Sequence, residues 1–323
     1  MKAGRSCPID YVLTEDMFIE NEVSDYNTIY VVGGLYGNIF ALEEIENIVK
    51  NGRKNGEKSI LVFNGDSHWF DKCEDTFFMV EKKIMNFITM QGNVEAEMTR
   101  DTDIGVGCGC AYPSCVDDAT VERSNRIHAE LKKITDANLE IKERMKERPK
   151  VKVLKMGNIK ICITHGDEKL LGGWGCSVDS LSNESRRKEL KGWMDSKGIS
   201  IMAVSHTCSP VFWGYEVEKN KYESEVSVIN NGAAGLPNFC DGRYGIITRI
   251  SESKSDKAIY RTKVREVYVE GIAVKYDNEK FIKWFDKVWP TGSPAEISYR
   301  DRIVNSTDVS LKSAVIGNID IVE

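Results

Sequence analysis

The chain lacks any apolar run long enough to cross a bilayer, and its first residues lead into polar, acidic sequence rather than an apolar signal segment. We therefore expect a cytoplasmic protein with no membrane partner. Positive charge is not in excess either, because 44 Lys and Arg stand against 50 Asp and Glu, a formal net charge of -6. This balance argues against broad electrostatic capture of nucleic acid. A protein partner stays open, and the sequence does not define the oligomeric state.

A disulfide framework is also not expected. The nine cysteines are an odd number without a secretory signal, which favours free thiols. Cys108, Cys110 and Cys115 lie in a Gly-rich loop and could hold a structural zinc ion if Cys73 or Cys176 supplied a fourth ligand. Their C-x-C-x4-C spacing departs from the usual cysteine pair and no second pair follows. We therefore favour a loop with incidental thiols.

Strands and helices alternate along the first half of the chain, with no internal repeat or low-complexity segment. Two continuous apolar runs, Thr28–Val32 and Ser59–Phe63, read as buried strands separated and followed by helical spacing, which predicts a parallel or mixed sheet covered by helices. The second half is richer in strands, which we expect at 151–154, 160–163, 201–204, 225–229, 245–248 and 264–272, before a short helix around 281–285.

We divide the chain into a surface arm, a main domain and an extension. The arm covers residues 1–27. The main domain covers 28–250, and a Cys- and Gly-rich loop followed by a charged helical insertion occupies about 101–148. Residues 251–323 are expected to be a C-terminal extension packed on the same domain.

Histidine is scarce, and two of the four histidines directly follow apolar strands. These two are His165 and His206, and Asp66 and Asn93 follow other β-rich runs. A carboxylate, an amide oxygen and two imidazoles form a mixed ligand set suited to a borderline divalent ion such as Mn, Zn or Fe. The alternative is ordinary turn chemistry, in which Asp and Asn cap helices and His packs with a satisfied hydrogen bond.

The order of these segments resembles the calcineurin-like metallophosphoesterases, in particular their prokaryotic phosphodiesterase-like branch. That family carries D-x-H-G-N, G-D, G-N-H-D/E, H-G, G-H-x-H and N-x-G-S-x-G-x-P. The matching segments here are residues 34–38, 65–66, 92–95, 165–166, 205–208 and 230–237. The resemblance covers about residues 28–250. It implies an α/β fold, a four-layer α/β/β/α sandwich of two mixed β-sheets flanked by helices, with hydrolysis of phosphate esters as the activity.

Carried over residue by residue, the resemblance implies that one of the family's two metal positions is kept and the other is lost. The kept ligand set is Asp66, Asn93, His165 and His206. At the degenerate first position the private ligands are replaced by Gly34, Tyr36 and Cys208. Val94 stands where the family has a histidine thought to protonate the leaving group, which valine cannot do. The expected cofactor is therefore one divalent transition metal ion (Mn, Zn or Fe), and a second ion is doubtful.

Three other side chains near the expected site carry weaker hypotheses. His68 is either an acid or replacement ligand at the mouth of the site, or a surface histidine beside an aromatic pair. His128, within the charged helix, is expected to be solvated. Tyr36 either donates a hydrogen bond to a phosphate oxygen or simply packs.

The expected function is metal-dependent hydrolysis of a phosphomonoester or phosphodiester at a single retained metal site, with low or atypical activity. Its ligand would be a small phosphate ester. The alternative is a catalytically inactive relative that binds a nucleotide, a phosphorylated ligand or a partner protein in the former active-site cleft.

Overall fold

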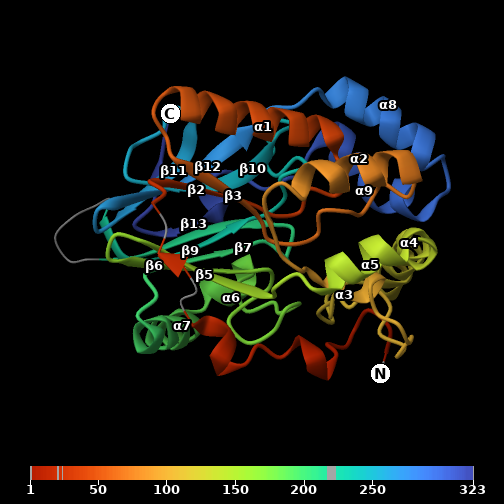
Figure 1. Cartoon of the computed structure of the whole chain (residues 1–323), viewed down its shortest axis with the longest axis horizontal. Helices are drawn as coiled ribbons and strands as arrows, with labels where there is room; N and C mark the ends of the chain where they lie inside the picture. The colour runs from red at the N-terminus through yellow and green to blue at the C-terminus, as the bar shows by residue number, and fades with distance from the viewer. Residues whose placement is uncertain (1, 20–21, 24, 217–222, 323) are drawn as a thin grey trace.

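The computed structural model describes residues 2–19, 22–23, 25–216 and 223–322, and it shows two β-sheet halves packed face to face between helices (Figure 1). The upper half in that view is covered by α1 (Ile39–Lys54), α2 (Glu74–Ile84) and α8 (Asn278–Val288). The lower half is covered by α6 (Val178–Ser182) and α7 (Glu184–Lys197). The predicted α/β/β/α sandwich is confirmed.

The strands of the upper half are β2 (Thr28–Val32), β3 (Ser59–Phe63), β4 (Ile88–Thr89), β10 (Gly245–Ser251), β11 (Ala258–Val264) and β12 (Val267–Val274). The strands of the lower half are β1 (Glu22–Val23), β5 (Val151–Met156), β6 (Ile159–Thr164), β7 (Ile201–Val204), β8 (Pro210–Glu216), β9 (Glu223–Asn231) and β13 (Val315–Gly317). A short strand β14 (Asp320–Ile321) pairs with β11. The two halves were predicted as separate sheets, but β9 and β11 pair in parallel, so hydrogen bonding is continuous.

The central strands are apolar throughout because both of their faces are buried. In β2, Ile29 and Val31 belong to the core between the two sheet halves, whereas Tyr30 and Val32 pack into the core under the upper helices. The same alternation divides the side chains of β6 and β7 between the inter-sheet core and the core under α7. Successive side chains point to opposite faces of a sheet, so continuous apolar runs result.

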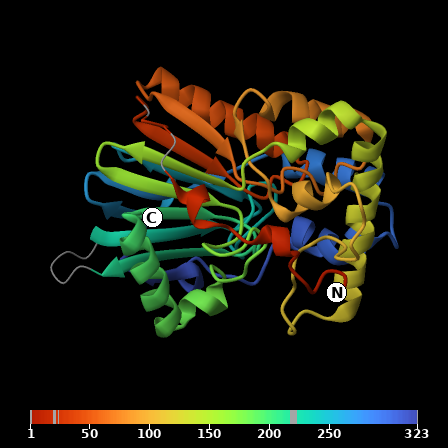
Figure 2. The same cartoon turned by 60° about the horizontal axis from the view of Figure 1, so that its bottom comes forward.

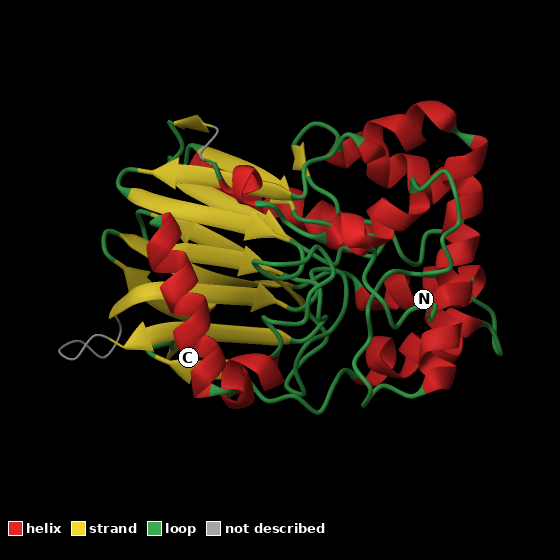
Figure 3. Cartoon of the chain, turned by 90° about the horizontal axis from the view of Figure 1, so that it is seen from below, coloured by secondary structure: helices red, strands yellow, loops and turns green. Residues whose placement is uncertain are grey.

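The remaining helices gather at one end of the sheets, with loops between them and the strands (Figure 3). They are α3 (Asn93–Met98), α4 (Asp118–Ala137), α5 (Leu139–Lys146) and α9 (Pro294–Asn305). Three short 3-10 helices complete the described elements, at Ile9–Tyr11, Glu15–Phe18 and Lys312–Ala314. None of the helices in the described ranges is long and apolar enough to cross a membrane.

The carboxyl ends of the parallel strands converge on these loops. Strands β2, β3 and β4 run parallel, and so do β6, β7 and β9. The side-chain Nδ2 of Asn64, just after β3, donates to the backbone oxygen of Thr164 at the end of β6 at 3.0 Å. The polar residues that follow the strands of both halves are therefore brought to one place.

Two sequence predictions need correction here. The run 264–272 was predicted as one strand, but β11 ends at Val264 and β12 begins at Val267, because the chain reverses in an antiparallel hairpin between them. The arm 1–27 was expected to lie on the surface, and Figure 2 shows its described part crossing the loops toward α4. Tyr11 in this arm is nevertheless fully buried. Its hydroxyl donates to Glu97 Oε1 of α3 at 2.9 Å.

Candidate metal centre

Four side chains from four loops meet at the carboxyl ends of the strands. Nε2 of His165 lies 3.1 Å from Oδ1 of Asn93, 3.1 Å from Nδ1 of His206 and 3.3 Å from Oδ1 of Asp66. All four residues are buried, with Asp66 the most exposed at 5%. Residues separated by up to 140 positions in the chain thus form one cluster, and it consists of the four side chains singled out from the sequence.

Backbone carbonyls hold the two imidazoles in defined tautomers. Nδ1 of His165 lies 3.0 Å from the oxygen of Asn64, and Nε2 of His206 lies 3.1 Å from the oxygen of Cys110. A carbonyl oxygen can only accept a hydrogen bond, so each of these nitrogens carries the proton and donates it. The opposite nitrogens, His165 Nε2 and His206 Nδ1, face the centre of the cluster, where each can offer a lone pair to a bound ion.

The amide of Asn93 is oriented in the same way by the loop that contains the cysteines. Its Nδ2 donates to the oxygen of Cys108 at 2.9 Å, which turns Oδ1 toward the histidines. The loop at Cys108 and Cys110 thus supplies backbone acceptors that orient two members of the cluster. Cysteine spacing alone does not reveal this role, because backbone carbonyls have no sequence signature.

The arrangement fits a divalent cation. Nε2 of His165 lies 3.1–3.3 Å from the other three candidate ligand atoms, close to the separation of about 3.4 Å between neighbouring ligands of a tetrahedral ion bound at about 2.1 Å. Asp66, His165 and His206 each offer one atom within 4.8 Å of the others and could hold a metal ion. Lone pairs held together in a buried site repel one another unless a positive charge lies between them.

The pKa shifts of the ionisable residues in the cluster also indicate that a positive charge is favoured there. Burial lowers the pKa of His165, but the facing carboxylate of Asp66 outweighs it, and the net shift is upward. Burial raises the pKa of Asp66, yet His165 and His206 bring it below its ordinary value. Burial and the neighbouring His165 lower the pKa of His206 to about 4, so this imidazole is neutral and available as a ligand at physiological pH.

Two glycines and one glutamate allow the loops to approach this closely. A Cβ at Gly65 would lie 2.5 Å from the backbone of Gly92, and Gly65 adopts φ +105°. The buried carboxylate of Glu95 accepts hydrogen bonds from the backbone N–H groups of Asp66, Ser67 and Gly92 at 2.8–2.9 Å. Its support of the loop was not predicted, although a Glu three residues after a helix N-cap is a recognisable capping signal.

The residues predicted to form a degenerate first position pack against one another. The hydroxyl of Tyr36 lies 2.6 Å from Sγ of Cys208, and its ring packs over Gly34, where a Cβ would lie 3.0 Å from the phenol. Gly34 and Tyr36 both have φ near +60°. Tyr36 and Cys208 thus form a packed phenol–thiol pair beside Gly34, and an ion placed among these residues would have to displace it.

A cavity of about 220 Å³ opens beside the cluster. Asp66 and His206 form part of its wall, and Val94, Tyr36 and Cys208 also line it. Three of the four positions that were predicted to be degenerate therefore face the same cavity as Asp66 and His206.

The structure places the other candidate histidines outside this cavity. His68 is fully buried rather than at a surface mouth, because Nδ1 donates to Asp71 at 2.6 Å and Nε2 donates to Glu81 at 3.2 Å. His128 was expected to be solvated but is only 4% exposed, since α4 packs this face against α3. Burial and the neighbouring Lys132 lower the pKa of His128 to about 4.

The thiols do not assemble a zinc site. Cys108, Cys110 and Cys176 are buried, whereas Cys73 and Cys115 are exposed. Within the part of the chain that the structure describes, the cluster with Asp66 is the only group of three or more His, Cys, Asp or Glu side chains close enough to share an ion.

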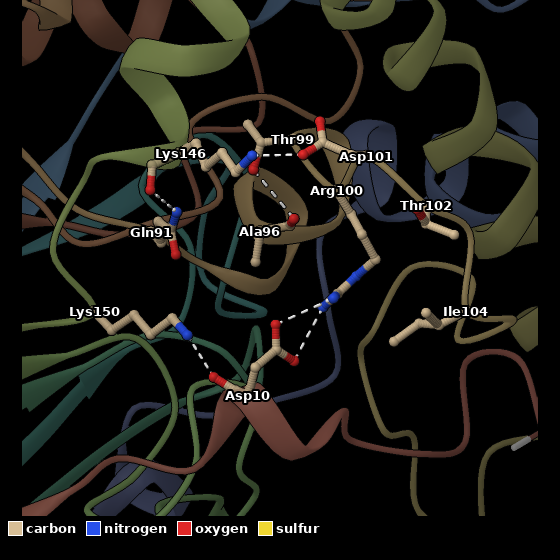
Figure 4. A pocket seen from close by; sticks show the side chains of 10 residues that line it. All are labelled: Asp10, Gln91, Ala96, Thr99, Arg100, Asp101, Thr102, Ile104, Lys146 and Lys150. Carbon is tan, nitrogen blue, oxygen red and sulfur yellow. Dashed lines mark hydrogen bonds and ion pairs between the residues drawn. The ribbon is translucent and has the colours of Figure 1, made fainter.

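A second cavity, of about 380 Å³, lies outside the cluster between the N-terminal arm and α5 (Figure 4). Its cations are already paired. Arg100 contacts Asp10 at 3.1 Å, Lys146 contacts Asp101 at 2.6 Å, and Lys150 donates to the backbone oxygen of Asp10. Because these pairs compensate one another, this cavity presents no convergent set of ligand atoms.

Comparison with known proteins supports the fold. No protein-family model matches the sequence, and no curated protein matches it. Among solved structures, the chain is similar to a hypothetical protein from Pyrococcus horikoshii, with a TM-score of 0.55 and 15% identity, covering 87% of this chain and 99% of that one. It is also similar to a metallophosphoesterase from Sphaerobacter thermophilus, with a TM-score of 0.53 and 13% identity, covering 88% of this chain and 100% of that one. At these identities the likeness establishes the fold alone.

Proposed function

We propose that this chain, which has the metallophosphoesterase fold, is a metal-dependent hydrolase of a phosphate ester with a single metal position formed by Asp66, Asn93, His165 and His206. One observation carries the proposal. In a buried cluster, Nε2 of His165 lies 3.1–3.3 Å from the ligand atoms of Asn93, His206 and Asp66, and neighbouring carbonyls accept hydrogen bonds from the outward-facing nitrogens of both imidazoles. Turn chemistry would not need this orientation, whereas metal coordination does.

A divalent ion in this cluster would polarise a phosphoryl oxygen and lower the pKa of a bound water. The protein's part is to orient the ligands and to shape the cavity. The cavity wall offers no ready acid for the leaving group. Val94 cannot donate a proton, and burial holds the pKa of Tyr36 and Tyr112 well above its ordinary value. We therefore expect esters whose leaving group departs without protonation to react best.

A second candidate function is binding without hydrolysis. The packed contact between Tyr36 and Cys208 favours it, because it occupies the position of the lost ion and leaves less charge to stabilise a transition state. In this case the cavity would hold a nucleotide, another phosphorylated ligand or a segment of a partner protein.

The test combines elemental analysis with a hydrolysis assay. Protein purified without chelator should contain one transition-metal ion per chain, and its hydrolysis of a panel of phosphate monoesters and diesters should stop on chelation and return with Mn or Zn. His165→Ala and His206→Ala should each lose the ion, because three remaining ligands bind much less tightly. Tyr36→Phe is the matched control within the cavity and should keep the ion.

The outcome of these measurements distinguishes the two candidate functions. Metal-dependent turnover supports the hydrolase. One bound ion with ligand binding but no turnover supports the second candidate. A wild-type protein that takes up no ion after reconstitution would refute the metal site itself.

A further inference from the structure

The cavity beside the metal cluster has aromatic walls and lacks cationic side chains. Trp69, Tyr112, Trp174 and Tyr299 line it together with Tyr36, and no Lys or Arg does so among the residues that the structure describes. Tyr112 comes from the Cys- and Gly-rich loop and Tyr299 from α9, so two segments outside the sheets contribute to its wall. These walls suit a flat, apolar group rather than a highly charged one.

The outer rings are held in place. Nε1 of Trp174 donates to the oxygen of Cys110 at 2.8 Å, and the hydroxyl of Tyr112 lies 3.1 Å from Oγ of Ser124. The rings of Tyr112 and Trp174 are 6.0 Å apart at 50°, and Tyr299 packs edge-on against Phe70 at 5.0 Å. Fixed rings lose little entropy when a ligand packs on them, which favours binding of a planar group.

Trp69 provides a buried hydrogen-bond donor without a well-formed partner. Its side chain is 3% exposed, and its Nε1 makes no hydrogen bond of good geometry within the described ranges, although the hydroxyl of Tyr299 lies near it. A buried N–H without an acceptor is unfavourable, and an oxygen of a bound ligand would relieve it. Because Trp69 lines the cavity beside Asp66, such an oxygen would lie near the metal cluster.

The net charge of the metal site determines which ionisation state of a ligand binds best. A divalent ion balanced by the single carboxylate of Asp66 leaves one positive charge, since His165, His206 and Asn93 are neutral ligands. A phosphodiester carries one negative charge and would be compensated. A phosphomonoester dianion would leave one negative charge in a largely buried cavity with no cationic side chain to pair it, which is unfavourable.

The size of the cavity limits the ligand further. Its volume of about 220 Å³ is below the range of roughly 300–1,000 Å³ that holds drug-sized ligands. There is room for a phosphoryl group and one ring, but not for two large substituents.

We propose that this cavity selects a monoanionic phosphodiester with one planar aromatic substituent, whose ring packs against Tyr112, Trp174 and Tyr299 while Trp69 donates a hydrogen bond to a phosphoryl oxygen. The proposal rests on the function proposed above, because it assumes an ion in the cluster. It adds the substrate class and the residues that determine it.

The experiment measures binding rather than turnover. Full-length protein loaded with one Zn ion is titrated calorimetrically at pH 8 with methyl phenyl phosphate, dimethyl phosphate and phenyl phosphate. The first is a monoanion with a ring, the second a monoanion without one and the third a dianion with one. Methyl phenyl phosphate should bind roughly tenfold or more tightly than either of the others.

Two variants and one control locate the effect. Trp69→Phe keeps a ring but removes the donor, and should weaken binding of both monoanions by roughly tenfold. Tyr299→Leu should weaken only the ligands with a ring. Trp284→Phe, on α8, is the matched control, because Trp284 donates to Thr76 and does not line the cavity. It should bind all three ligands as the wild type does.

The outcomes are distinct from those for hydrolysis. Equal affinity of the wild type for the three phosphates overturns the proposal even if the protein hydrolyses esters. Selective binding of methyl phenyl phosphate without any turnover supports the proposal and refutes the hydrolase. If Trp69→Phe fails to fold, the comparison of ligands on the wild type and on Tyr299→Leu still decides.

Discussion

The buried charge network at His68 leads to a strong prediction on the pH dependence of stability. His68 is fully buried, stacks on Phe77 with ring centroids 3.9 Å apart, and donates to Asp71 and Glu81 from its two nitrogens. Glu81 is also paired with Arg148. Both ring nitrogens can donate only when the imidazole is protonated.

The pKa shift of His68 determines how much the network contributes to the free energy of unfolding. Burial lowers the pKa of His68, but the carboxylates of Asp71 and Glu81 outweigh it and raise the pKa to about 9 from 6.5. A difference of about 2.5 units corresponds to about 3 kcal/mol at 1.36 kcal/mol per unit. Because the pKa is higher in the folded state, this stabilisation is fully present below pH 6.5 and is lost as the pH rises through 9.

The assay compares the wild type with His68→Gln by urea unfolding from pH 6 to pH 9.5. Glutamine can still donate a hydrogen bond but does not titrate, and changes at other titrating groups cancel in the difference between the two proteins. The wild type should lose about 3 kcal/mol of its advantage in unfolding free energy across this range. A difference that stays constant with pH would show that His68 is not charged in the folded protein, and the reasoning would be refuted.

Three further predictions concern the cluster and its support. Rebuilding the predicted first metal position should work only in combination. Gly34→Asp alone should destabilise the protein, because its Cβ would lie 3.0 Å from the ring of Tyr36. Gly34→Asp combined with Tyr36→His, Cys208→His and Val94→His should bind two ions and hydrolyse an aryl phosphodiester about 100-fold faster. An inert variant with two ions would contradict this. Tyr11→Phe should lower the unfolding free energy by about 1–3 kcal/mol and leave the metal content unchanged, as measured by urea unfolding and elemental analysis, because it removes a buried hydrogen bond under α3. Metal content should also survive replacement by serine of all three cysteines of the Gly-rich loop. Backbone carbonyls orient the ligands there, and the thiol of Cys110 contacts Asn93 at Nδ2 (3.2 Å) rather than at its ligand oxygen. Loss of the ion would show that a thiol coordinates it. The serine variant tests Cys108, Cys110 and Cys115.

Much of the central architecture could be predicted because its pattern is local. Continuous apolar runs such as Thr28–Val32 arise when both faces of a strand are buried, and a polar residue directly after such a run must lie at the end of the strand. That is why the sequence placed His165 and His206 at strand ends. The meeting of these side chains was predicted from the family resemblance, and parallel strands that end at one edge make it possible.

Other features depended on neighbours that are distant in the sequence. His68 is buried because Glu81, and through it Arg148, closes over it, and His128 is buried because α4 packs against α3. Both histidines lie in polar or charged sequence, so local composition suggested exposure. Tyr11 was missed for the same reason, since a short polar arm gives no indication that one of its side chains enters the interior.

The sequence by itself determined the strand ends and the mixed set of polar side chains that follows them, because each depends on which residue stands at a position in a local pattern. Only the tertiary structure decided what surrounds them. The carbonyls of Asn64 and Cys110 orient the imidazoles, Tyr36 packs against Cys208, and aromatic rings line the cavity. Backbone groups and packed rings act through distance and direction, and these exist only once the chain has folded.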